Sequence, residues 1–134
     1  MENCVFCKIV KGEIPSEKIW EDDNVLAFLD INPLTKGHAL VIPKKHFENI
    51  FDIDENVLER IISAGKNLAQ KSKAALGAVA VNLLNSSGSQ AGQKVMHFHL
   101  HVIPRYENDG VIISAPRKNK VEPEELKEIS SKLR

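Results

Sequence analysis

The chain has 134 residues, a length that predicts a single domain over residues 1–134. Hydrophobic residues make up 43% and charged residues 27%, which excludes the disordered, collagen-like and low-complexity classes. Eighteen Lys and Arg balance eighteen Asp and Glu, and only five Phe, one Tyr and one Trp are present, so we expect no nucleic-acid partner. Because no long apolar run or leader is found, we expect a cytoplasmic protein with no membrane partner.

The first part of the chain predicts a short helix followed by an antiparallel meander. Residues 4–10 suit one or two helical turns, closed by Gly12. Apolar runs separated by turn residues then predict three strands, over residues 18–20, 25–29 and 38–42.

One long helix is expected next. Asp52 and Glu55 have the spacing of a capping box. Apolar and small residues then recur at helical spacing as far as Gly77, which favours a helix over about 54–76.

The last part of the chain predicts two more strands and a second helix. The strands are expected at 78–84 and 95–103, on either side of a loop of small residues at 85–92. Pro123 suits the start of a C-terminal helical extension at about 123–134. Strands, one interposed helix and further strands indicate an α+β fold rather than a doubly wound parallel sheet.

A row of alternating histidines carries the main chemical signal: His97, His99 and His101. On a strand, side chains two residues apart share a face, so the three imidazoles are expected on one side. The outer two rings would start about 13 Å apart on a strand that rises about 3.3 Å per residue, which strains a zinc site made of all three. The row favours nucleophilic chemistry, in which one ring attacks and its neighbours hold charge.

The segment from His97 to Ile103 resembles the histidine-triad (HIT) signature, His-φ-His-φ-His-φ-φ, where φ is apolar. Other motifs resemble the Hint-like branch of that family in its prokaryotic, zinc-binding form: CVFCKI at 4–9, GEIP at 12–15, FLDINP at 28–33, GHALVIPKKH at 37–46 and AGQ at 91–93. The resemblance implies a five-stranded antiparallel sheet with one long helix and short N- and C-terminal helices. It also implies a homodimer.

The resemblance implies a hydrolase of the purine nucleoside phosphoramidase type, cleaving nucleoside monophosphate esters and amidates at the α-phosphorus. His99 is then the nucleophile, and the product of its attack is a nucleotidyl-histidine. His101 would bind the phosphate or the leaving group, and His38 would orient the row; a surface histidine is the alternative for His38. No cofactor is implied for the chemistry. A dinucleoside polyphosphate hydrolase or nucleotidyltransferase, and a nucleotide-sensing scaffold protein, are the alternative functions.

The nucleotide itself is implied to lie between a carboxylate and an apolar cleft. Asp30 matches the residue that accepts hydrogen bonds from the ribose hydroxyls, although a plain turn residue is the alternative. Five residues match the cleft around the base, with ordinary core packing as their alternative: Phe6, Ile9, Phe28, Ile31 and Leu40.

The phosphate-binding positions depart from the family pattern. Lys94 stands where the family often has a serine, and it is either a phosphate ligand or a solvated loop lysine. Ser86 stands where an asparagine is usual, with Asn85 beside it to take the same role. Gln93 and Val95 are further candidates for stabilising an oxyanion. These departures leave the leaving-group preference open.

A structural zinc ion is the last expectation. Cys4 and Cys7 form a short C-x-x-C pair, and His46 with His97 would complete a Cys₂His₂ set of the kind found in closed zinc sites. Some prokaryotic HIT proteins resemble this arrangement. The alternatives are a reduced cysteine pair in an N-terminal turn and a His97 that acts through hydrogen bonds alone.

Overall fold

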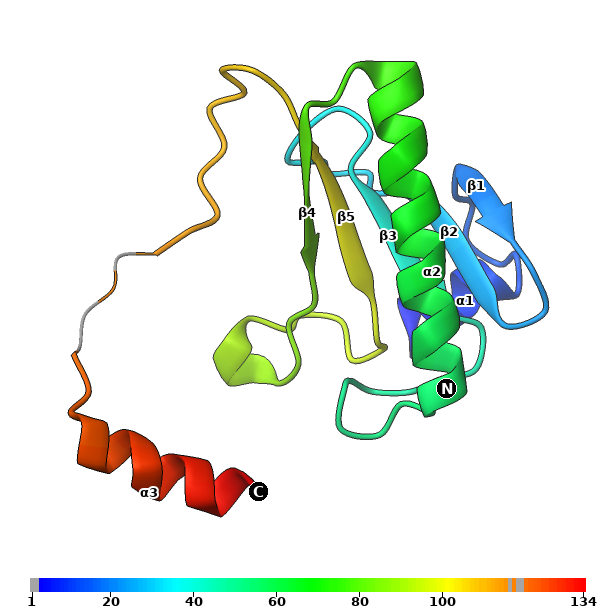
Figure 1. The fold of residues 1–134 in the computed structure, drawn as a ribbon. Helices are drawn as coiled ribbons and strands as arrows, with labels where there is room; N and C mark the ends of the chain where they lie inside the picture. The colour runs from blue at the N-terminus through cyan, green and yellow to red at the C-terminus, as the bar shows by residue number, and fades with distance from the viewer. Residues whose placement is uncertain (1–2, 116, 118–119) are drawn as a thin grey trace.

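The strands form one five-stranded antiparallel sheet (Figure 1). The computed structural model describes residues 3–115, 117 and 120–134. The strands are β1 (Lys18–Glu21), β2 (Val25–Leu29), β3 (Ala39–Pro43), β4 (Ala80–Leu84) and β5 (Leu100–Arg105). Their order across the sheet is β1-β2-β3-β5-β4. The expected α+β class and five-stranded antiparallel sheet are confirmed.

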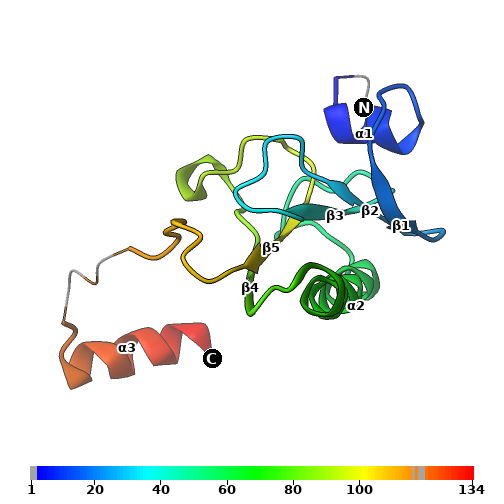
Figure 2. The ribbon, with the colours of Figure 1, turned by 90° about the horizontal axis from the view of Figure 1, so that it is seen from above.

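Helices cover the two faces of this sheet (Figure 2). The short α1 (Val5–Val10) lies on one side, and the long α2 (Glu55–Lys71), with a π-helical continuation at Ser72–Leu76, lies on the other. The C-terminal α3 (Pro123–Leu133) buries no residue and lies away from the sheet in both views. Among the described residues, no helix has both the length and the apolar content that a bilayer crossing requires.

Two apolar cores result, one on each face. The core under α2 contains ten buried residues: Val25, Ala27, Ala39, Val41, Ile61, Ala64, Leu68, Phe98, Leu100 and Val102. The core under α1 contains six: Phe6, Ile9, Leu26, Phe28, Leu40 and Ile42. Because β2 and β3 are covered on both sides, they are apolar almost throughout instead of alternating with polar residues.

The start of α2 differs from the expectation. Asp54, not Asp52, caps the helix, and its carboxylate accepts a hydrogen bond from the Val57 amide at 3.1 Å. The carboxylate of Asp52 accepts hydrogen bonds from the amides of Glu48 and Asn49 in the preceding loop. At the other end, Gly77 closes the helical run in a left-handed conformation as expected.

The predicted strand at 95–103 is wrong at both ends, because β5 spans Leu100–Arg105. Its pairing with β3 ends where Val41 faces Leu100. Further along β3, Pro43 has no amide to donate, and its carbonyl is taken by the His97 ring at 2.8 Å. The strand continues past Ile103 because it is still paired with β4 there.

The loop between β2 and β3 carries Asp30, Ile31 and His38, and hydrogen bonds hold it to the last residues of β5 and to Tyr106 beyond it. Thr35 Oγ1 donates to the carbonyl of Pro104 at 2.6 Å, and Tyr106 Oη donates to the carbonyl of Lys36 at 2.6 Å. Gly37 has a φ of +86°, and a Cβ added there would lie 2.6 Å from Leu76 Cδ1. The positive φ favours glycine at this position, and a side chain there would also have to displace the Leu76 methyl group.

We expect Gly37→Ala to lower the free energy of unfolding by about 2–3 kcal/mol, because it adds a steric clash to the cost of a positive φ. Denaturant titration measures the change.

Gly12→Ala is the matched control, because Gly12 has a φ of +80° with no atom within 4 Å of the added Cβ. It should cost only about 1 kcal/mol. Equal losses in the two variants would contradict the role given to the Leu76 contact.

Candidate functional site

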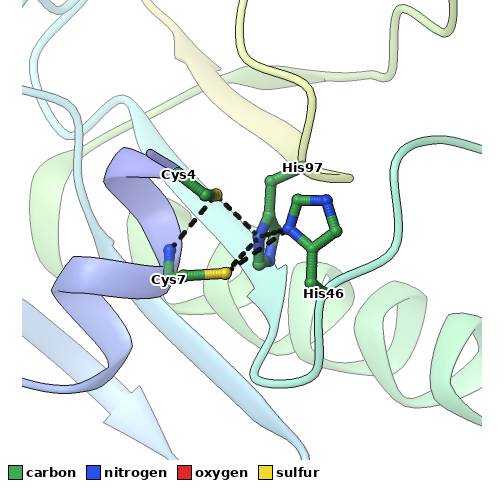
Figure 3. Close-up of side chains that lie close together, drawn as sticks. All are labelled: Cys4, Cys7, His46 and His97. Carbon is green, nitrogen blue, oxygen red and sulfur yellow. Dashed lines mark hydrogen bonds between the residues drawn. The ribbon is translucent and has the colours of Figure 1, made fainter. Parts of the chain in front are cut away.

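Two cysteines and two histidines from distant parts of the chain meet beside α1 (Figure 3). Their donor atoms all lie within 4.8 Å of one another. The Cys4 Sγ to His97 Nδ1 distance is 3.3 Å, and Cys7 Sγ lies 3.4 Å from His46 Nδ1. Cys7 Sγ lies 3.6 Å from His97 Nδ1, and the two Nδ1 atoms are 3.2 Å apart. All four residues of the expected metal set are therefore brought together.

These spacings fit the edges of a zinc tetrahedron. Zn–N bonds of about 2.05 Å and Zn–S bonds of about 2.3 Å place two nitrogens about 3.3 Å apart, and a sulfur and a nitrogen about 3.6 Å apart. Burial and the neighbouring Cys4 raise the pKa of the Cys7 thiol. A bound cation would offset that effect, because a metal ion favours the thiolate.

The His97 ring is oriented by its second nitrogen. Its Nε2 lies 2.8 Å from the carbonyl of Pro43, which can only accept, so Nε2 carries the proton. The lone pair of Nδ1 then faces the two sulfurs. Burial lowers the pKa of His97 to about 4, so the ring is neutral at neutral pH. A neutral ring fixed by a carbonyl is the usual state of a metal-ligating histidine.

A cleft of about 560 Å³ lies next to this cluster on the α1 face of the sheet. Its volume is within the range of small-molecule sites. The residues that line it come from α1, the loops after α1 and β2, strands β2, β3 and β5, and the loop before β5: Val5, Phe6, Ile9, Ile14, Pro15, Ser16, Phe28, Leu29, Asp30, Ile31, Asn32, Leu40, Ser86, Gly92, Lys94, Val95, His99 and His101.

His99 presents a free ring nitrogen. Its Nδ1 lies 2.8 Å from the carbonyl of His97, so Nδ1 is protonated and the lone pair is on Nε2. The Asn85 side chain donates to the carbonyl of His99 at 3.0 Å and holds the backbone in place of a strand partner. Burial lowers the pKa of His99, which keeps the ring neutral and therefore nucleophilic.

His101 has the opposite tautomer. The amide of Leu34 donates to His38 Nδ1 at 3.0 Å, so the proton of the neutral His38 ring is on Nε2. That proton points to His101 Nδ1, 2.9 Å away, which leaves the His101 proton on Nε2. Asp30, His38 and His101 lie close enough to one another to form a possible metal-binding set. However, His38 Nε2 carries a proton and therefore cannot bind a metal ion. The group is a hydrogen-bond relay.

Asp30 shapes a turn and also lines the cleft. One carboxylate oxygen accepts from the Asn32 amide at 2.8 Å and shapes the turn. The other lies 3.6 Å from His38 Nε2, and the residue lines the cleft. Beside it, Ile31 is 89% exposed at the rim, whereas the other four apolar cleft residues predicted are buried.

Comparison with known proteins identifies the family. The HIT domain model matches residues 11–108. The chain belongs to the HIT family. The HIT protein of Bacillus subtilis is 43% identical over 134 residues, covering 98% of this chain and 92% of that protein. The crystal structure titled as a Zn-bound histidine triad family protein from Mycobacterium smegmatis has a TM-score of 0.81 at 34% identity, covering 98% of each chain. Arabidopsis thaliana adenylylsulfatase HINT3 is 42% identical over 107 residues, covering 80% of this chain and 54% of that protein.

The HIT triad does not lie on one regular strand. Only His101 is inside β5, whereas His97 and His99 precede it. The alternation survives, since Phe98, Leu100 and Val102 pack under α2 while His99 and His101 line the cleft opposite. His97 turns instead to the cysteines.

The loop residues predicted to bind phosphate fall into two groups. Ser86, Lys94 and Val95 line the cleft. Asn85 and Gln93 are outside its lining and instead make hydrogen bonds that hold the segment between β4 and β5. Gln93 is buried, and its side-chain Nε2 donates to the carbonyls of Glu48 and Val95, at 2.6 and 3.1 Å.

Several cleft residues escaped sequence reasoning. Seven lining residues were not predicted as site residues: Val5, Ile14, Pro15, Ser16, Leu29, Asn32 and Gly92. All but Ser16 stand within the CVFCKI, GEIP, FLDINP and AGQ motifs, which were the available signal.

We expect the stability of the protein to fall as the pH is lowered from about 6.5 to about 4. Burial and the nearby His99 and His38 lower the pKa of His101 to about 4. An unfolded histidine titrates near 6.5, so between these values the unfolded chain binds more protons. Denaturant titrations at a series of pH values should show about 1–2 kcal/mol of this loss from His101, after allowance for its partial exposure.

His101→Gln supplies the comparison, because glutamine keeps a donor but does not titrate. The difference in stability between wild type and variant should shrink toward pH 4. A difference that stays constant over the whole range would contradict the lowered pKa.

Proposed function

We propose that this protein is a nucleotide hydrolase that cleaves nucleoside monophosphate esters and amidates at the α-phosphorus. This proposal depends mainly on the tautomers of two histidines in the cleft: His99 has a lone pair on Nε2, whereas His101 has a proton on Nε2. A nucleophile and a hydrogen-bond donor thus line one cleft. The adenylylsulfatase named among the relatives supports a nucleotide substrate.

The proposed chemistry proceeds in two displacements. In the first, the bond from His99 Nε2 to phosphorus forms while the bond from phosphorus to the leaving group breaks. The leaving group departs with the electron pair and is protonated from solvent. In the second, water attacks the phosphorus of the nucleotidyl-histidine, the P–N bond breaks, and Nε2 recovers its lone pair as the proton passes to solvent.

The rest of the cleft suits a nucleoside. Asp30 has an oxygen available to accept from ribose hydroxyls, and the exposed Ile31 side chain offers an apolar surface to a base at the rim. The His101 Nε2–H would donate to a phosphoryl oxygen or to the leaving atom. A purine base and phosphoramidate substrates are the specific proposal.

We also propose that the Cys4, Cys7, His46 and His97 cluster holds a structural Zn²⁺. Four ligands with tetrahedral spacing leave no open position, so the ion would stabilise α1 and the His97 segment without taking part in the reaction.

A homodimer is the proposed assembly. The edge strand β4 exposes Val81, Leu83 and Leu84, at 38%, 41% and 37%, which supports burial against a second copy. A cytoplasmic location, a single domain over residues 1–134 and the absence of nucleic-acid and membrane partners stay predictions.

The two alternative functions differ from this proposal in measurable ways. A dinucleoside polyphosphate hydrolase or nucleotidyltransferase would turn over diadenosine polyphosphates, or transfer the nucleotide to another acceptor, faster than it hydrolyses AMP amidates. A nucleotide-sensing scaffold would have only incidental turnover, and its nucleotide binding would survive His99→Ala with no cellular phenotype from the lost catalysis.

We expect His99→Ala to lower kcat/KM for adenosine 5′-phosphoramidate by about 10³-fold or more, because it removes the attacking nitrogen. Brief mixing of the wild type with substrate should add the mass of one AMP group to the protein, and the variant should not gain it.

Folding and chemistry are separated by two further measurements. The variant should keep the thermal stability of the wild type within about 3 °C. In His99→Gly, added imidazole should restore part of the turnover by replacing the missing ring. Full activity in His99→Ala would rule out the assignment.

Elemental analysis should find one zinc ion per chain, and Cys7→Ser should lose it. Loss of a ligand thiolate should lower the free energy of unfolding by about 3 kcal/mol or more, measured by denaturant titration.

A chelator provides the internal control. It should lower the stability of the wild type to that of Cys7→Ser and leave Cys7→Ser unchanged. A chelator that leaves the stability of the wild type unchanged, or a wild type that binds no added Zn²⁺, would disprove the zinc site.

A further inference from the structure

The cleft has one charged side chain of each sign among the residues that line it. Asp30 supplies the carboxylate, and Lys94 supplies the only lysine or arginine. Most of the remaining lining is apolar or small. A ligand that lies along the cleft therefore meets one negative and one positive group.

Lys94 stands on a firmly held piece of backbone. The buried side chain of Gln93, next to it, donates to the carbonyls of Glu48 and Val95 and accepts from the amide of Gly88 at 2.7 Å. Three residues further on, His97 is fully buried in the cysteine cluster. The backbone of Lys94 is thus fixed relative to His99, while its exposed side chain can change conformation to reach a ligand.

The lysine lies at an opening of the cleft. It lines the cleft together with Ser86 and His99, and it also lines a neighbouring hollow of about 650 Å³ that contains His46 and Glu48. No carboxylate of the described residues lies within ion-pair distance of its ammonium group. The charge of Lys94 is therefore available to a ligand.

The direction of the proposed reaction gives this charge a role. With the ribose at Asp30 and the phosphorus at His99, the leaving group extends away from the nucleoside toward Ser86 and Lys94. An ammonium group on a flexible stem recognises charge rather than a planar shape.

We propose that Lys94 is a specificity-determining residue that selects leaving groups carrying a negative charge beyond the scissile bond. The chemistry is that of a small anion: a carboxylate, a sulfate or a further phosphate. The inference rests on the proposed function, because it concerns the leaving group of that reaction.

The test uses two adenosine 5′-phosphoramidates of matched size, one with β-alanine and the other with β-alaninamide as the leaving amine. The wild type should favour the carboxylate substrate. In Lys94→Gln, the ratio of kcat/KM for the carboxylate substrate to that for the amide should fall about three- to tenfold, and it should fall further in Lys94→Glu. Added salt should lower the ratio in the wild type and change it little in Lys94→Gln.

Lys66→Gln is the charge-matched control, since Lys66 is exposed on α2 across the sheet. It should keep the wild-type ratio. Adenosine 5′-phosphosulfate and a diadenosine polyphosphate complete the series, and the substrate that loses most in Lys94→Gln identifies the anion.

The outcomes separate the two proposals. Equal ratios in the wild type and Lys94→Gln, with active enzyme, would overturn the role of Lys94 and leave the hydrolase intact. No turnover of either amidate and no nucleotidylated His99 in the wild type would overturn both.

Discussion

His97 joins three parts of the site through three different groups. Its Nε2 donates to the carbonyl of Pro43, its Nδ1 faces Cys4 and Cys7, and its own carbonyl accepts from His99 Nδ1. The first contact sets the ring orientation, the second anchors the N-terminal helix, and the third fixes which nitrogen of His99 is free. The orientation of the free His99 nitrogen thus depends on a residue that does not line the cleft.

The backbone leaves the sheet before Leu100, so His97 and His99 stand on an irregular segment. A regular strand would place His97 and His99 side by side over the same face. Instead, Pro43 ends the ladder on one side, and the Asn85 side chain replaces a backbone partner on the other. The irregular segment allows one histidine to reach the cysteines while the next two line the cleft.

The sequence predicted the elements better than their bounds, and most of the residues predicted to contact a nucleotide line the cleft. Strand alternation correctly predicted Phe98 and Leu100 on the face opposite His99 and His101, because side chains alternate whether or not the ladder is complete. The bounds of β5 were missed because its start depends on Pro43 and its end on the pairing with β4, and both partners are distant in sequence. The cap of α2 was misplaced by two residues since Asp52 and Asp54 are both competent, and only the fold assigns Asp52 to the preceding loop. The contacts of Gln93 likewise depend on a loop about 45 residues away.

The contact between Cys4 and His97 spans 93 positions of the chain. During synthesis, the N-terminal helix leaves the ribosome long before the segment that completes its cluster. A six-residue helix is too short to persist alone in water, so it waits without a stable docking partner. The cluster, and with it the contact that orients the His99 ring, is therefore completed late in biosynthesis.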